Sequence, residues 1–463
     1  VMANTYSELA DRLRPYLGGQ RSTAAGGTAP VAPVASAPAQ ADYILSVEGG
    51  ICRAHDGRTG GLAYAGGDHA TVIQQAIGAA GVGGVLAFRG GDYHIGAQLT
   101  PLARQSWLCV YDAVFRPTGN NRIIYAEQID WWCVYGTLHI EDTDRHTSSV
   151  EAIYLNGIAA CYFQHILIWD YWQGVTFTGE AGRSFENVFE YLYMAVIRHQ
   201  GLAIWAEVGD NYFNNVFIKG PSTTEWATGQ GLVIGLYPGV GTIFGGIMFG
   251  RVEVLDCQTN VDLQGLYEVW FDQLLSDNAY FAALYIGDRV QRLFVGTIWA
   301  AGSGEGIWIQ GSPESTARRL RINQAFCWVN AVHGLLFNGW VEGVSIGSLY
   351  LLENQVAQLR FARGWNRNIS IDNLTVVDSN RLAVDAGGVD GPDANVSIAH
   401  ADIDDGECMG LDLLRSINGT RDGKLFENGG VVYIAPGNAA AAAAHGLEGR
   451  PLHVNLTAFH PDA

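Results

Sequence analysis

The sequence predicts an all-β protein, a right-handed, single-stranded parallel β-helix of about eleven coils with a short N-terminal helix and a cap. Three observations predict this fold. A corner motif recurs about every 25 residues, and a second apolar motif lies between successive corners. The composition, with 59 Gly, 11% aromatic and only 16% charged residues, is typical of strands and turns around a large core.

The corner motif opens with a large apolar residue, followed two places on by a polar residue and three places on by an apolar one. The residue after the opening one is Gly, Asn or Asp in eight copies, and these types accept a left-handed backbone. We therefore expect a two-residue corner between two strands, with polar side chains such as Asn187 and Asn215 stacked in register. The copies open at Tyr135, Phe163, Phe185, Phe213, Phe249, Phe271, Val295, Ile322, Ile346, Ile371 and Ile398.

The second motif has apolar residues at alternate positions, which is the period of a strand with one face inward. One coil then holds three short strands. Leucine-rich repeats have a similar period, but their Leu-x-x-Leu-x-Leu frame is absent, and propeller blades are longer. The copies occupy residues 153–155, 175–177, 202–204, 232–234, 261–263, 284–286, 307–309, 335–337, 359–361 and 382–384.

Composition divides the rest of the chain. Residues 1–17 form an amphipathic attachment helix that we expect to dock on another protein, and residues 18–41 are a Gly/Ala/Pro-rich linker. Residues 42–100 hold the N-terminal cap, in which Asp68 begins a helix that leads into a Gly-Gly strand and plugs the open end of the coils. The β-helix spans 101–406, and 407–463 is a C-terminal cap or appendage.

Charge and cysteine content exclude several classes of protein. The formal net charge of −19 repels phosphate backbones, so we expect no nucleic-acid partner. We find no signal peptide and no membrane span, so no membrane insertion is expected. The seven cysteines are scattered and indicate reduced, buried thiols. The acidic run from Asp402 to Glu407 favours a solvated turn, and nothing predicts a metal or cofactor.

Outward positions of the predicted coils are unusually apolar, and something must cover such a stripe. We favour a homotrimer in which identical coils pack around a three-fold axis. The alternative is a carbohydrate platform with Trp299, Trp308 or Tyr350 against sugar rings. After the corner, the expected outward series runs His139, Leu167, Phe189, Phe217, Glu253, Leu275, Trp299, Phe326, Tyr350, Thr375 and Asp402.

The cap helix and Gly-Gly strand between Asp68 and Tyr93, followed by parallel coils, resemble the pectate-lyase-like β-helix superfamily. The N-terminal helix and linker resemble its bacteriophage tailspike and tail-fibre branch. This resemblance implies a polysaccharide lyase or glycoside hydrolase and, for the phage proteins, a homotrimer that binds host surface glycans. The lyase signature of clustered Asp with a catalytic Arg or Lys is absent, so the resemblance assigns no catalytic residue.

Glycoside hydrolysis needs two carboxylates about 5 to 9 Å apart, and Glu253, Asp256 and Asp277 are the candidate catalytic cluster. Glu225 and Trp226 are ligand-binding candidates, because they lie in the loops of the longest coil. A competing hypothesis is structural. Asp170, Asp256, Glu353, Asp378 and Asp405 all follow the second apolar residue of a corner by four places, which is typical of a turn position.

The sequence therefore predicts a virion tailspike or tail-fibre subunit that binds a cell-surface polysaccharide. Whether it also depolymerises that polysaccharide is left open. We expect the protein to fold in the host cytoplasm, to reside in the virion and to act outside the cell. The alternatives are a purely structural virion component and a cellular polysaccharide lyase or glycoside hydrolase.

Overall fold

The computed structural model describes residues 40–142, 149–221, 229–235, 245–362, 364–377, 382–385 and 396–403, and the strand backbones at 407–409, 416–419, 425–428 and 431–434. The chain divides into two units, Val1–Ala37 and Pro38–Ala463, and every described residue belongs to the second. The expected helix at 1–17 and most of the linker at 18–41 lie outside the described residues.

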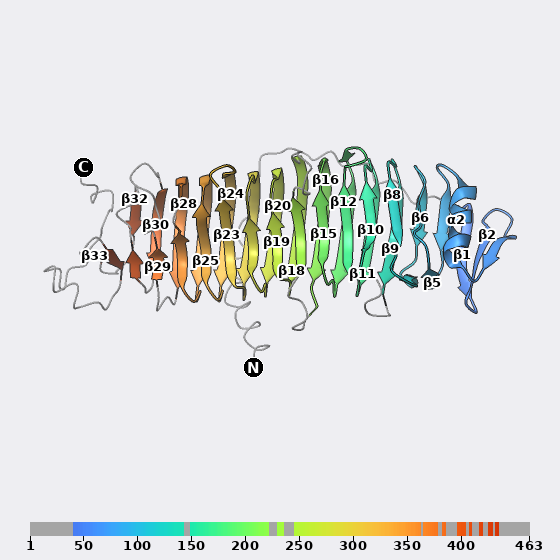
Figure 1. The fold of residues 1–463 in the computed structure, drawn as a ribbon, viewed down its shortest axis with the longest axis horizontal. Coiled ribbons are helices and arrows are strands. Elements are labelled where there is room, and N and C mark those ends of the chain that lie inside the picture. The colour runs from blue at the N-terminus through green and yellow to red at the C-terminus, as the bar shows by residue number, and fades with distance from the viewer. Residues whose placement is uncertain are drawn as a thin grey trace. The chain divides into compact units, whose positions relative to one another are not determined.

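The second unit is a parallel β-solenoid of about eleven turns, which confirms the predicted fold class (Figure 1). Each coil contributes one long strand to a sheet of 20 described strands, here sheet A, and one short strand to a sheet of 14, here sheet B. Sheet A contains β1 Tyr43–Glu48, β2 Ile51–Asp56, β3 Leu62–Gly66, β4 Val85–Phe88, β5 Gly91–Ile95, β6 Ser106–Cys109, β7 Ala113–Pro117, β9 Cys133–Glu141, β11 Tyr162–Trp169, β13 Ser184–Phe185, β14 Val188–Ala195, β16 Val208–Lys219, β18 Gly245–Leu255, β20 Tyr267–Asp277, β22 Gln291–Ala301, β24 Ala317–Trp328, β26 Val341–Leu352, β28 Asn366–Val377, β30 Val396–Ile403 and β32 Ser416–Gly419. Sheet B contains β8 Ile124–Glu127, β10 Glu151–Asn156, β12 Gln173–Thr178, β15 Gln200–Trp205, β17 Gln230–Gly235, β19 Thr259–Leu263, β21 Ala282–Ile286, β23 Glu305–Gly311, β25 His333–Gly339, β27 Ala357–Phe361, β29 Leu382–Asp385, β31 Glu407–Met409, β33 Leu425–Asn428 and β34 Val431–Ile434.

The opening residues of the corner motif stack inside the solenoid. Phe189 lies between Phe163 and Phe213, with ring centroids 4.6 and 4.7 Å away, and the column continues through Phe249 and Phe271 at 4.9 and 4.7 Å. These spacings match the distance between neighbouring strands, because each coil places the same residue above its predecessor. All five rings are buried. The predicted continuous column of inward hydrophobes is confirmed.

The corner itself differs from the prediction. In β18 and β20, Phe249 pairs with Phe271 and Arg251 with Gln273, and the pairing skips Gly250 between them. The two expected strands are therefore one long strand with a bend, so a coil has fewer separate strands than we expected. Of the eight Gly, Asn and Asp residues expected to be left-handed there, only Gly136, with φ of 75°, has a positive φ.

The left-handed backbone occurs instead where a long strand of sheet A ends. Asp170, Asp256 and Glu353 have φ values of 54°, 57° and 51°. This confirms that their position, four places after the second apolar residue of the corner, is a turn. Asp378 and Asp405 lie outside the described residues. Acidic side chains suit such turns because they bond locally to the backbone and tolerate this conformation.

Three frames in the predicted repeat were wrong. Phe163 pairs with Val134, and β9 has one extra residue before Thr137 pairs with His165, so the first corner opens at Val134 and not at Tyr135. Phe163 also pairs with Phe189, which pairs with Phe213, so the third corner opens at Phe189 and not at Phe185. Phe189 is therefore a buried core residue, and Tyr193 takes its place in the outward series. The strand motif at 382–384 is also displaced. Its predicted frame sets Ala383 opposite Arg360, but Arg360 pairs with Asp385.

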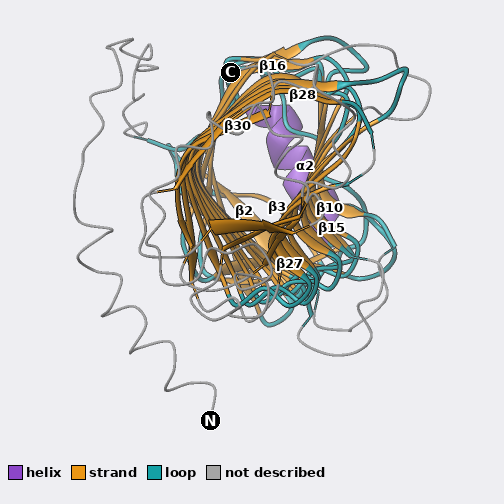
Figure 2. Cartoon of the chain, turned by 90° about the vertical axis from the view of Figure 1, so that its left-hand side faces the viewer, coloured by secondary structure: helices purple, strands orange, loops and turns teal. Residues whose placement is uncertain are grey.

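Both ends of the described solenoid carry elements that break the parallel pairing. At the N-terminal end, α2 His69–Ala80 begins at Asp68, whose side chain accepts a hydrogen bond from the Thr71 N–H, as the sequence predicts. Looking along the coils, Figure 2 shows α2 lying across the far end of the stack. Antiparallel pairs β1–β2, β2–β3 and β33–β34 accompany the two ends. Such pairs protect sheet edges against edge-to-edge association.

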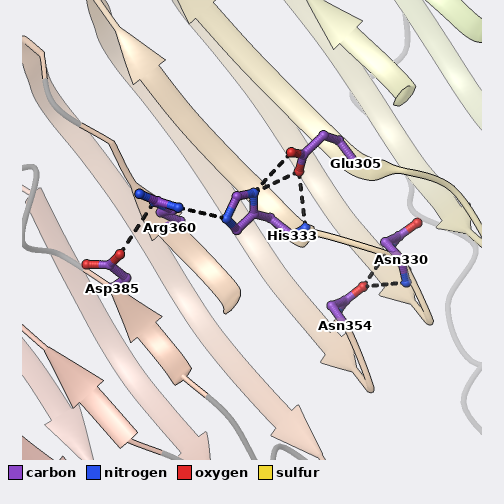
Figure 3. Close-up of polar contacts among 6 residues, drawn as sticks. All are labelled: Glu305, Asn330, His333, Asn354, Arg360 and Asp385. Carbon is purple, nitrogen blue, oxygen red and sulfur yellow. Dashed lines mark hydrogen bonds and ion pairs between the residues drawn. The ribbon is translucent and has the colours of Figure 1, made fainter. Parts of the chain in front are cut away.

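Buried asparagines form ladders, although not the expected one. The Asn187 side chain donates to Asn211 at 2.8 Å, whereas Asn215 is exposed. In the later coils, Asn330 donates to Asn354 at 2.8 Å (Figure 3). Asn330 also donates to the Ala300 carbonyl at 3.1 Å. Each amide satisfies backbone groups at a turn that would otherwise be buried without a partner.

A chain of charged residues crosses four strands of sheet B (Figure 3). The ring Nδ1 of His333 lies 2.9 Å from Glu305 Oε2, and Arg360 Nη1 lies 3.2 Å from His333 Nε2. Arg360 Nε is 3.4 Å from Asp385 Oδ2. Because arginine can only donate, Nε2 of His333 accepts and Nδ1 carries the hydrogen. The charges thus satisfy one another within the fold.

No helix among the described residues is long and apolar enough to span a membrane.

Candidate functional site

A groove of about 420 Å³ opens on the outer face of sheet A in the early coils. Its residues come from three neighbouring strands, β9, β11 and β14, and from Tyr111 in the turn between β6 and β7. The lining consists of Tyr111, His139, Glu141, His165, Leu167, Trp169, Tyr191 and Tyr193. Successive residues of a strand point to opposite faces. Because the apolar residues between the lining residues point into the core, the lining residues point outward.

Register places the lining residues in rows across the strands. His139 pairs with Leu167, which pairs with Tyr193, and Glu141 pairs with Trp169. Trp169 is followed in its row by the small Ala195. The Trp169 ring leans over Tyr193, with an interplanar angle of 9° and centroids 6.4 Å apart.

Several aromatic rings of the groove remain open to solvent. Tyr111 is 66% exposed, Trp169 42% and Tyr191 37%. Most large aromatic residues in the described part of the chain are covered, so three exposed rings around one hollow are a feature that the fold does not require. Tyr193 is half-buried because it stacks on Phe217 at 4.7 Å, and burial raises its pKa.

Two histidines lie at the floor of the groove, and both are held in the neutral form. Burial lowers the pKa of His139 and outweighs the opposing effect of the Glu141 carboxylate. Burial, with a small contribution from His139, lowers the pKa of His165. Nδ1 of His165 lies 3.1 Å from Thr137 Oγ1, and its buried Nε2 has no hydrogen-bond partner. The enclosed Nε2 is out of reach of a ligand, so His165 lines the groove as a neutral ring.

The groove holds one carboxylate, which belongs to an ion-pair network. Arg116 Nε donates to Asp92 Oδ1 at 2.7 Å, and Arg116 Nη1 lies 3.0 Å from Glu141 Oε2. The second contact lacks hydrogen-bond geometry, so we treat it as an ion pair. His139 Nε2 is 3.9 Å from the same Glu141 oxygen. Two carboxylates thus share one guanidinium beside the groove.

The candidate catalytic cluster lies on the same face of sheet A but in later coils, away from the groove lining. Glu253 pairs in register with Leu275, and Asp277 follows two residues later on that strand. Strand spacings then put Glu253 and Asp277 about 8 Å apart along the diagonal. Glu253 is bonded to Arg251 at 2.8 Å. Asp256 occupies the turn and lies 3.6 Å from Lys219 Nζ, so its position has a structural explanation.

The candidate ligand-binding residues are divided between the two sheets. Trp299 and Tyr350 lie on sheet A on either side of Phe326, which stacks on Tyr350 at 4.7 Å with an interplanar angle of 7°. Trp308 lies on sheet B, 5.0 Å from Phe281 and 5.4 Å from Tyr285. Glu225 and Trp226 lie outside the described residues. Stacked neighbours cover each other's ring faces, so this row offers a ligand mostly edges.

Tyr111, Trp169 and Tyr191 line the groove although their sequence pattern did not predict it. The incorrect frame at Phe185 hid the alternation Tyr191, Leu192, Tyr193, Met194, in which both tyrosines point outward. Trp169 ends a strand and Tyr111 lies in a turn, where strand periodicity no longer predicts direction.

Comparison with known proteins gives little beyond the fold. No protein family matches the sequence, and no curated protein is significantly similar to it. Among solved structures, the chain is similar to the catalytic unit of a thermostable GH87 alpha-1,3-glucanase from Streptomyces thermodiastaticus, with a TM-score of 0.39 and 11% sequence identity. The similarity covers 74% of this chain and 66% of the glucanase chain.

Proposed function

We propose that this protein binds a polysaccharide, and that the groove on sheet A is where it binds. The observation that carries the proposal is the combination of exposed aromatic rings, two neutral histidines and one carboxylate around a single hollow. Sugars present C–H faces that pack against aromatic rings and hydroxyls that bond to neutral polar groups. A few polar groups in an otherwise apolar cleft are typical of small-ligand sites.

A glycan array followed by calorimetry on the best ligand tests this proposal. Trp169→Ala should weaken binding about tenfold, because it removes an exposed ring worth about 1.4 kcal/mol of contact. The matched control is Trp131→Ala, which removes another exposed tryptophan, 53% exposed against 42% for Trp169, outside the groove lining. If both variants bound the glycan with equal affinity, the groove would not be the binding site. No binding on the array would favour a purely structural protein.

The proposal extends from polysaccharide binding to attachment of a virion to its host cell. In this proposal the protein is a virion spike or fibre subunit that recognises a host surface polysaccharide, and it acts as a homotrimer. The resemblance of the N-terminal region and the apolar row around Trp299, Phe326 and Tyr350 support this. Light scattering coupled to size exclusion measures the mass directly, and a monomer at micromolar concentration would contradict the trimer.

Depolymerisation is a second candidate function, favoured by the positions of Glu253 and Asp277. Their backbone positions lie about 8 Å apart, which lets the two carboxyl groups adopt a separation that an inverting glycosidase uses. If they act as acid and base, Glu253→Ala and Asp277→Ala should each abolish release of oligosaccharides while glycan binding at the groove persists. Unchanged release from both variants would exclude this pair.

A further inference from the structure

The charges around the groove bear on the class of glycan that it accepts. Asp92 and Glu141 share Arg116, which leaves one net negative charge at the groove wall. Asp112 and Glu190 are the chain neighbours of two lining residues, Tyr111 and Tyr191, and are acidic as well. The whole chain carries a formal net charge of −19. A polyanionic glycan would meet repulsion at every distance.

Two arginines near the groove, within the part of the chain that the structure describes, are already paired. Arg116 lies between two carboxylates, and Arg198 forms an ion pair with Asp170 at the end of β11. Both histidines are kept neutral by burial, which lowers the pKa of each. The groove thus lacks an uncompensated positive charge among its lining residues, and a uronic acid or sulfate would find no partner there.

The aromatic rings complete the argument. A cation is attracted to the face of Trp and Tyr rings within about 6 Å, most strongly where water is partly excluded. Tyr111, Trp169 and Tyr191 bring exposed rings to one hollow, and the Glu141 carboxylate lies in the same lining. Aromatic rings with a nearby carboxylate are the arrangement that recognises substituted ammonium groups.

Building on the proposed function, we propose that the groove selects glycans carrying positively charged amino groups over neutral and anionic glycans. The ammonium group of an amino sugar lies against the open rings, close to the carboxylates of Glu141 and Asp92. The sugar ring packs on Trp169, whose ring is open to solvent at the groove. Selectivity thus comes from charge and ring faces together.

The test compares affinities within sets of oligosaccharides that share a backbone and differ only in charge. Each set contains an N-trimethylated form with a permanent positive charge, an N-acetylated neutral form and an O-sulfated form, on several linkages. At pH 7.5 and low salt, the cationic form should bind roughly three- to thirtyfold more tightly than the neutral one, as expected for one or two cation–π contacts. The sulfated form should bind most weakly, and added salt should reduce the differences.

Two variants separate charge from contact area. Glu141→Gln keeps the shape of the groove and should reduce the ratio of the cationic to the neutral affinity at least threefold. Tyr111→Ala, at a site that is 66% exposed and therefore free of folding consequences, should reduce the same preference. The matched control is Glu314→Gln, which removes the same charge from an exposed turn residue and should change nothing.

Competition gives an independent readout. Tetramethylammonium chloride should displace a bound cationic oligosaccharide, whereas sodium chloride at the same ionic strength should displace less. Equal affinity for cationic and neutral forms, or tighter binding of the sulfated form, would overturn the selectivity and leave the proposed binding function intact. Failure of every glycan to bind would overturn the binding function itself.

Discussion

Replacing Phe213 by Ala should destabilise the solenoid by about 4 kcal/mol. Phe213 is fully buried and has stacked rings on both sides, Phe189 at 4.7 Å and Phe249 at 4.9 Å, with Phe177 edge-on at 6.1 Å. Truncation of a buried Phe to Ala costs about 3–5 kcal/mol. We expect the upper half of that range, because a stacked aromatic pair contributes about 0.5–1.5 kcal/mol beyond its buried area, and two such pairs are lost.

Urea unfolding followed by circular dichroism measures this loss, and Phe213→Leu is the matched control. Leucine keeps much of the volume and should cost less than about 2 kcal/mol. Because coils contact mainly their neighbours, hydrogen exchange should show lost protection concentrated in β14, β16 and β18. A loss below about 2 kcal/mol for Phe213→Ala, or uniform loss of protection along all coils, would refute the stacked-column argument.

Three further predictions concern the turns and the groove. Burial lowers the pKa of His139 and His165 from their ordinary value of 6.5, so below that pH the unfolded chain binds protons that the folded chain excludes. The free energy of unfolding should therefore fall as the pH drops below 6.5, and above 6.5 these two groups should not affect it. Chemical denaturation of a variant with Gln at both positions should show a flatter dependence of this free energy on pH. Val329 is a β-branched residue at φ of 53°, so Val329→Asn should raise stability by about 1 kcal/mol in denaturant titrations, and a decrease would show that the turn tolerates valine without strain. Asn330→Ala should cost about 3 kcal/mol, because it removes the acceptor of the Ser303 N–H and the donor to the Ala300 carbonyl, and a cost below 1 kcal/mol would mean that water replaces the ladder.

The incorrect frame at Phe185 has a simple physical cause. A strand has a period of two, so a displacement by four residues keeps the alternation of apolar and polar side chains and cannot be detected from that alternation alone. The incorrect frame at Phe185 was such a displacement, since Phe189 also opens an apolar-polar alternation. Only the pairing with Phe163 and Phe213 distinguishes the two frames.

Turn chemistry was partly predictable. Acidic residues at one recurrent position of the repeat indicated turns. Asp170, Asp256 and Glu353 have the positive φ values of such turns. The bends inside the long strands could not be predicted, because Gly, Asn and Asp favour both left-handed turns and simple interruptions of strand pairing. Whether such a residue has positive φ depends on how the next coil packs on it.

The sequence by itself determined the coil. Large inward hydrophobes recur once per turn, and only a stacked solenoid can bury all of them in one column, so Phe249 and Phe271 had to lie above one another. The tertiary structure decided the groove. Its rings and charges come from three coils and a turn, and their convergence depends on strand register, on the lean of Trp169 over Tyr193 and on the ion pairs of Arg116. Periodicity specifies which residues face inward, but where outward side chains meet is set by contacts between coils.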